Sequence, residues 1–220
     1  MRRIRILAEG TTEEAFVKEI LSPHLQTLAI YAEVTVLSTK VVRSGGKFRG
    51  GVTSFAKFES DLRRLLADRQ ADCITMMIDF YGLAGLGFPG WDRLPASTAR
   101  QKVDYMEQML AQYFNNRRFI PYFALHEFEA MLFADISQLK TVYPMLDEKT
   151  LTQLKAARDA VPSPEDINLE QPPSKRIRAL VKEYDKVTAG NLVLLEVTLP
   201  RIRQACSHFD QWLTRLEALA

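Results

Sequence analysis

Short apolar runs alternate with amphipathic stretches along the first half of the chain. Nearly continuous apolar residues at 3–8 and 73–79 predict buried strands, and β-branched or aromatic residues predict two more at 33–37 and 118–125. Apolar residues at helical spacing predict helices at 11–30, with a break at Pro23, and at 55–69 and 99–113. This alternation predicts an α/β fold with a mostly parallel, Rossmann-like sheet flanked by helices.

The pattern changes after residue 135. Helix-like runs follow at 151–160, 174–184, 195–205 and 209–219, and prolines separate them. We therefore predict an α/β domain over residues 1–135 and a C-terminal helical extension over residues 136–220 that packs on it.

Composition narrows the function classes without choosing one. The chain is 47% hydrophobic and 25% charged, with a formal net charge of +2, so any surface for nucleic acid must be a local one. Cys73 and Cys206 stand far apart and suggest reduced thiols rather than a disulfide framework. No apolar window approaches membrane-spanning length and the start lacks a signal-peptide pattern, so we expect a cytoplasmic protein that does not contact a membrane.

Three predicted strands end in acidic residues. Glu9 follows the first strand, Asp79 ends the third, and the fourth runs into His126, Glu127 and Glu129. Because ligands bind outside the carboxyl ends of parallel strands, we expect these side chains to meet at one edge of the sheet. Carboxylates there suit Mg²⁺ or Mn²⁺, and such ions promote phosphoryl chemistry.

Each candidate also has a structural interpretation. Glu9 is either a metal ligand or a solvated charge at a strand end, and Glu13 is either a ligand or a stabiliser of a helix start. Glu127 and Glu129 share a face only if the chain is extended there. His126 is a general base, an orienting residue or a histidine of the core.

Two basic stretches are candidates for binding phosphate or nucleic acid. Lys47 and Arg49 lie in a glycine-rich stretch at 44–51, which is either a clamp for a polyanion or an ordinary loop. Lys175 and Arg176 stand in the first turn of a predicted helix capped by Ser174, which is either an anion site or a plain exposed turn.

Five motifs from one end of the chain to the other carry a family resemblance. They are AEGTTE at 8–13, DFYG at 79–82, LHEFEAMLFAD at 125–135, PSKRI at 173–177 and CSHF at 206–209. The Glu-Gly strand end and the later Asp79 resemble the Toprim domain, and the whole set resembles a family of uncharacterised bacterial Toprim-like proteins, related to the Toprim domains of OLD-type nucleases.

The resemblance implies a Mg²⁺-dependent nuclease site with Glu9 as its first acid and Asp79 as its second. It also implies a role in anti-phage defence beside an ATPase partner. Tyr81 departs from the family pattern, because Toprim proteins usually carry a second aspartate at this position.

Three functional hypotheses follow. The first is a nuclease subunit that cleaves DNA or RNA, in which Glu9, Asp79, Glu127 and Glu129 hold one or two ions. The second is a catalytically degenerate binding or sensor subunit of a multi-protein defence complex. The third is a phosphatase or nucleotidyltransferase for small substrates. The oligomeric state stays open, with a homodimer among the options.

Overall fold

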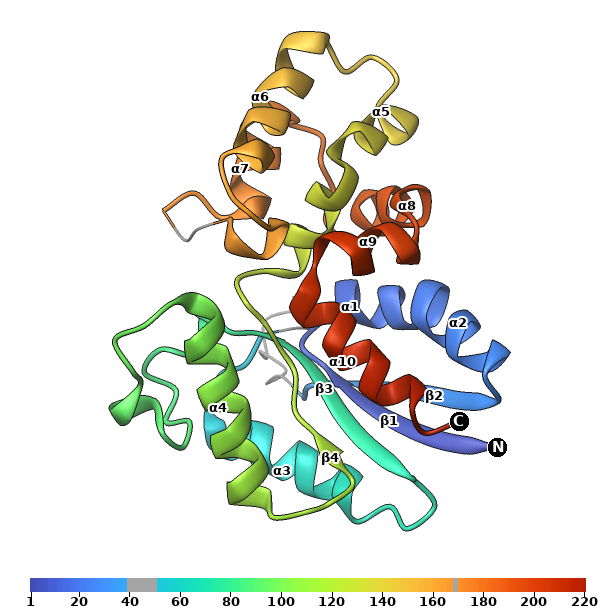
Figure 1. Ribbon diagram of the computed structural model, residues 1–220, viewed down its shortest axis with the longest axis vertical. Coiled ribbons are helices and arrows are strands. Elements are labelled where there is room, and N and C mark those ends of the chain that lie inside the picture. The colour runs from blue at the N-terminus through green and yellow to red at the C-terminus, as the bar shows by residue number, and fades with distance from the viewer. Residues whose placement is uncertain (39–50, 168–169) are drawn as a thin grey trace, which may run out of the picture. The chain divides into compact units, whose positions relative to one another are not determined.

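The computed structural model describes residues 1–38, 51–167 and 170–220 (Figure 1). The chain forms two compact units: the first comprises Met1–Phe123 and Leu216–Ala220, and the second comprises Ala124–Arg215. The sequence placed the boundary between residues 135 and 136. In the structure the change falls earlier, so the acidic stretch from His126 to Glu129 belongs to the second unit.

The first unit is built on a parallel sheet. Its strands are β1 (Arg2–Ala8), β2 (Ile30–Val36), β3 (Cys73–Asp79) and β4 (Phe119–Ile120), in the order β2-β1-β3-β4, and β5 (Phe123–Ala124) also pairs with β3. The pairs β1–β2, β1–β3 and β3–β4 are all parallel. The predicted α/β class with a mostly parallel sheet is confirmed.

Helices cover both faces of this sheet. Figure 1 shows α1 (Thr11–Phe16) and α2 (Ser22–Thr27), joined by the π-helical turn η1 (Val17–Leu21), on one face, and α3 (Phe55–Leu66) and α4 (Ala99–Phe114) on the other. The crossovers from β1 to β2 and from β2 to β3 run in opposite directions across the sheet, so right-handed connections place their helices on opposite faces. Two short 3₁₀ helices, η2 (Tyr81–Leu83) and η3 (Trp91–Arg93), follow β3.

Two prolines account for two of the differences between the first unit and the predicted elements. The strand expected at 118–125 divides into β4 and β5 around Pro121, which has no N–H for the ladder. The break expected at Pro23 takes the form of the π-helical turn just before it, and the helical path continues to Thr27.

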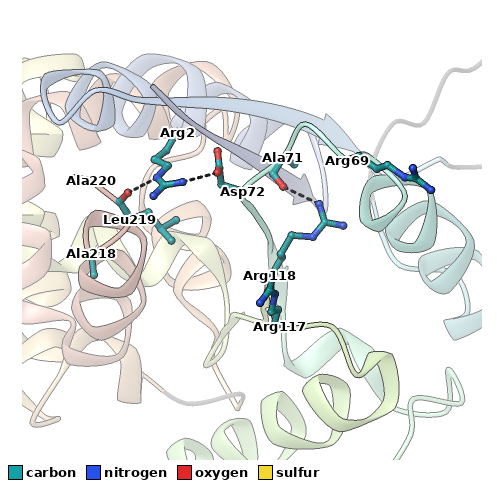
Figure 2. A pocket seen from close by; sticks show the side chains of 9 residues that line it. All are labelled: Arg2, Arg69, Ala71, Asp72, Arg117, Arg118, Ala218, Leu219 and Ala220. Atoms are coloured by element: carbon teal, nitrogen blue, oxygen red, sulfur yellow. Dashed lines mark hydrogen bonds and ion pairs between the residues drawn. The ribbon is translucent and has the colours of Figure 1, made fainter.

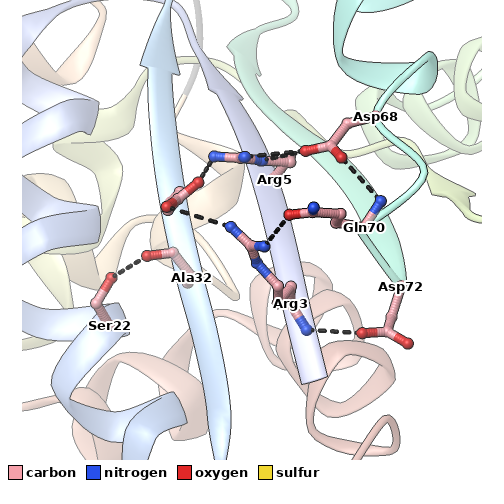
Figure 3. A network of polar contacts seen from close by, with 8 residues as sticks. Arg3, Arg5, Ser22, Ala32, Asp68, Gln70 and Asp72 are labelled. Atoms are coloured by element: carbon pink, nitrogen blue, oxygen red, sulfur yellow. Dashed lines mark hydrogen bonds and ion pairs between the residues drawn. The ribbon is translucent and has the colours of Figure 1, made fainter. Parts of the chain in front are cut away.

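An ion-pair network joins β1 to its neighbours (Figure 3). Arg5 pairs with Glu33, its register partner on β2, and its Nε donates to Asp68 Oδ2 at 2.9 Å. The Arg3 guanidinium donates to Gln70 at 2.5 Å, and the Arg3 backbone N–H donates to an oxygen of Asp72 at 2.8 Å. Along β1, Arg3 and Arg5 alternate with buried Ile4 and Ile6, so the start of this strand has one charged face and one apolar face.

The second unit is helical. Its elements are η4 (Phe128–Gln138), α5 (Leu139–Val142), α6 (Glu148–Asp159), η5 (Pro164–Asp166), α7 (Pro173–Leu180), α8 (Thr188–Val197), α9 (Leu199–Ala205) and α10 (Ser207–Glu217), whose last turn enters the first unit. The 3₁₀ segment η4 forms its centre, and it buries Phe128, Leu132 and Phe133 among α6, α7, α8 and α9.

The single helix expected at 195–205 is two helices in the structure. Thr198 has a positive φ of 72°, and Pro200 stands in the first turn of α9. Proline cannot donate the hydrogen bond that would continue α8, so a new helix begins. Among the helices that the structure describes, none is both long enough and apolar enough to cross a bilayer.

Candidate functional site

The strand order creates a switch point between β1 and β3. The chain leaves β1 for β2 on one side and returns to β3 on the other side of β1. In open α/β sheets, ligands bind in the crevice outside the carboxyl ends of the strands at such a point. Glu9 directly follows β1 and Asp79 ends β3, so both acids stand at this position.

The structure brings Glu9 and Asp79 together. Ala8 pairs with Met77 in the register, and the Glu9 N–H donates to the Met77 carbonyl at 3.0 Å. The Asp79 N–H donates in turn to Glu9 Oε2 at 2.9 Å. Asp79 is buried and Glu9 is partly exposed. The carboxylate of Glu9 is therefore held against the end of the neighbouring strand, as the strand-end argument predicts.

Glu13 has a contact typical of a helix start. Its Oε2 accepts a hydrogen bond from the Gly10 N–H at 2.8 Å, and the side chain is buried. An acid in the first turn satisfies an unpaired backbone donor and interacts favourably with the helix dipole. This contact accounts for Glu13 through the stability of α1, while a role as a metal ligand stays a prediction.

Tyr81 stands at the position where the Toprim resemblance predicts a further aspartate. It begins η2, one residue beyond Phe80, which follows the end of β3, and it is 42% exposed. A neutral phenol is a poor ligand for Mg²⁺, which prefers carboxylates, water and phosphate oxygens. Of the two positions in this motif, only Asp79 supplies a carboxylate.

Glu127 has a structural partner in the second unit. Its Oε2 accepts from the Ser174 N–H at 2.9 Å and its Oε1 accepts from the Ser174 hydroxyl at 3.0 Å. Ser174 stands in the first turn of α7, which begins at Pro173 rather than at the expected serine cap. The predicted anion site at this helix start thus already holds an anion, the carboxylate of Glu127.

The two basic residues of that turn differ in their surroundings. Lys175 is exposed, and the Nε of Arg176 donates to the Gln171 carbonyl at 2.6 Å. Their role in binding phosphate stays a prediction, and Lys47 and Arg49 lie outside the described residues.

Glu129 lies beside a lysine in a dry environment. It is fully buried, and its Oε1 is 3.1 Å from Lys186 Nζ. Burial raises the pKa of Glu129, and the charge of Lys186 partly opposes that shift. The hydroxyl of Tyr184 is buried without a hydrogen-bond partner in the part of the chain described, and burial together with the Glu129 charge raises its pKa. The arrangement is that of a buried charge pair.

His126 is buried in the second unit with a lowered pKa. Desolvation is the main cause, and the charges of Asp166 and Glu127 oppose it. Its Nδ1 has no hydrogen-bond partner among the residues that the structure describes. A neutral imidazole near pH 7 can accept a proton, and it also suits a core position.

Lys186 and Glu165 of the second unit have partners far away in the chain, and the sequence pattern did not predict these contacts. Lys186 neutralises Glu129, and Glu165 accepts hydrogen bonds from the N–H groups of His208 at 3.0 Å and Phe209 at 3.1 Å. The second contact satisfies the start of α10 and gives the CSHF motif a structural role. No spacing rule relates residues so far apart.

These features define an α/β protein whose sheet carries two adjacent acids at its switch point. The chain matches the family described as Domain of unknown function (DUF4276) over residues 8–217, and it belongs to this family. No curated protein and no solved structure matches the chain.

Proposed function

We propose that this protein is a Toprim-like, metal-dependent nuclease subunit that hydrolyses phosphodiesters at the Glu9–Asp79 site. One observation carries the proposal: acids from two neighbouring parallel strands stand side by side at the switch point, where the backbone N–H of Asp79 donates to the Glu9 carboxylate at 2.9 Å. The nucleic-acid substrate, the ATPase partner and the role in anti-phage defence rest on the sequence resemblance.

The donor set at this site fits a hard cation. Mg²⁺ takes one or two protein carboxylates and keeps several waters and substrate phosphate oxygens as its other ligands. Glu9 and Asp79 are the residues that would hold Mg²⁺ or Mn²⁺. When bound, such an ion polarises a phosphate and lowers the pKa of a coordinated water.

The protein fixes the orientation of the Glu9 carboxylate. The backbone bonds from Glu9 to Met77 and from Asp79 to Glu9 fix one carboxylate relative to the other strand. A ligand group held by its neighbours loses little conformational freedom when it binds an ion. His126, Glu127 and Glu129 are not required by this proposal, and their participation remains a separate prediction.

A cleavage assay with the purified full-length protein tests the proposal. Labelled single-stranded DNA and RNA are incubated with Mg²⁺ or Mn²⁺, and Glu9→Gln and Asp79→Asn are compared with wild type. We expect both variants to lose metal-dependent cleavage. Glu19→Gln and Asp92→Asn are matched controls, because both side chains are exposed acids of the same unit. Undiminished cleavage by both site variants would refute the proposal.

Tyr81 supports a second candidate, a degenerate binding or sensor subunit. Its phenol stands where a further carboxylate would complete the Toprim pattern. Calorimetry that detects no binding of Mn²⁺ to wild type favours this candidate. Restored metal binding in Tyr81→Asp would then show that this position had disabled the site.

A further inference from the structure

A pocket of about 650 Å³ opens at the amino ends of the strands of the first unit (Figure 2). Four arginines contribute to its lining, together with Ala71, Asp72 and residues 218–220. Arg2 begins β1, Arg69 follows α3, and Arg117 and Arg118 directly precede β4. Because the amino ends of parallel strands share one edge, these separate segments converge there, away from the edge that carries Glu9 and Asp79.

Two of the arginines are anchored by the fold. Arg118 donates to the carbonyls of Leu66 at 2.6 Å, Asp68 at 2.7 Å and Ala71 at 2.8 Å, so it satisfies the carbonyls at and beyond the end of α3. Arg2 donates to the Leu219 carbonyl at 3.2 Å and pairs with Asp72 at 2.9 Å. These contacts hold two positive charges in fixed positions.

The other two arginines have no such partners. Arg69 and Arg117 are exposed, and over residues 1–38, 51–167 and 170–220 neither makes an ion pair or a side-chain hydrogen bond. Among the described residues that line the pocket, Asp72 is the one acidic side chain, and its oxygens already accept from Arg2 and from the Arg3 N–H. These two bonds hold the pKa of Asp72 below its usual value, so it stays ionised and committed to them. The positive charge of the pocket therefore exceeds the negative charge of its lining.

We propose that this arginine pocket binds phosphate groups, with Arg69 and Arg117 as the adjustable contacts. Guanidinium groups suit phosphate because their planar donors match two of its oxygens at once. The fixed charges of Arg2 and Arg118 add attraction without a further ordering cost, since the fold already holds them. The phosphate belongs either to a nucleic-acid backbone or to a small phosphorylated compound.

This proposal does not rest on the nuclease proposal. It concerns a different edge of the sheet and none of the acids of the Glu9–Asp79 site. Glu9→Gln and Asp79→Asn should therefore abolish cleavage while leaving phosphate binding unchanged, so failure of one proposal is distinguishable from failure of the other.

The test compares two double variants of the full chain. Arg69→Ala with Arg117→Ala removes the adjustable contacts, and Arg64→Ala with Arg93→Ala removes the same charge from exposed arginines of the same unit outside the pocket. Fluorescence anisotropy measures binding of labelled single-stranded DNA over a range of salt concentrations, and calorimetry measures binding of pyrophosphate. Urea unfolding of both double variants checks that the fold is intact.

The outcomes show whether the arginine pocket binds phosphate and from which kind of compound. If the pocket binds a nucleic-acid backbone, the pocket variant binds DNA roughly tenfold or more weakly and the magnitude of its salt slope falls by about 1.4, while the control variant stays closer to wild type. If it binds a small compound, wild type and control bind pyrophosphate and the pocket variant does not. The proposal is overturned if wild type binds neither probe more tightly than the pocket variant, or if the control loses as much.

Discussion

The acids of the two units look alike in sequence and differ in their surroundings. In the first unit, Glu9 and Asp79 end neighbouring strands and are joined through a backbone N–H. In the second unit, Glu127 accepts two hydrogen bonds from Ser174, and Glu129 pairs with Lys186 in a fully buried position. The chemistry of a carboxylate thus depends on its partner more than on its place at the end of an apolar run.

Charge balance explains why this difference matters. A carboxylate whose two oxygens accept bonds at a helix start is already stabilised as an anion, so a metal must displace those bonds to bind it. A buried glutamate beside a lysine has its charge balanced by the protein. Glu9 and Asp79 stand at the ends of neighbouring strands, where a divalent cation would balance the charges of both acids.

The largest expected effect is on metal affinity. Glu9→Gln and Asp79→Asn should weaken Mn²⁺ binding by more than about 100-fold, because loss even of groups that orient a metal's ligands costs 10–100-fold. Calorimetry on the full chain measures this, with Asp92→Asn as the control. Glu127→Gln should bind Mn²⁺ as wild type does, and an equal loss in that variant would show that acids of both units serve one ion.

The second effect is on stability. Glu127→Ala should lower the free energy of unfolding by about 2 kcal/mol, because it removes a charged acceptor and leaves the Ser174 donors unpaired. Urea denaturation measures the change, and Ser174→Ala completes a double-mutant cycle that isolates the pair. A loss below roughly 0.5 kcal/mol would mean that the contact does not support α7 as described.

The third effect is a pH dependence from Glu129. Its folded pKa lies above its ordinary value of 4.5 because of burial, so the native state binds this proton more tightly than the unfolded state. The contribution to stability is complete below pH 4.5 and is lost as the pH rises through the folded pKa. Between the unfolded and folded pKa values, the free energy of unfolding falls by about 1.4 kcal/mol for each pH unit. Glu129→Gln should remove this decline in urea unfolding measured over a pH series. An unchanged pH profile in the variant would contradict the inference that burial raises the pKa of Glu129.

The smallest effect concerns Glu13. Its bond to the Gly10 N–H predicts that Glu13→Ala lowers stability by about 1 kcal/mol or less, with Mn²⁺ affinity unchanged. Thermal unfolding and calorimetry measure the two quantities, and exposed Glu19→Ala is the control. A tenfold loss of metal affinity in Glu13→Ala would instead place this residue with Glu9 and Asp79.

The pattern of apolar and polar residues predicted the parts of the structure that depend on local spacing. The α/β class, the strand Cys73–Asp79 and the acids at the ends of β1 and β3 all follow from periodicity, since parallel strands bring their carboxyl ends to one edge. Two differences from the predicted elements also have a cause that is visible in the sequence. Pro121 divides one expected strand, and Pro200 divides one expected helix.

Partners far apart in the chain were decided by the tertiary structure alone. Nothing in the spacing of Glu127 and Ser174, or of Glu129 and Lys186, indicates that they meet. The arginine pocket likewise needs the strand order, since β1, β3 and β4 are neighbours in the sheet and the segments before them therefore lie close together. The spacing of apolar residues predicts which face of a helix or strand is buried. The charged partner of a side chain instead depends on how the whole chain folds.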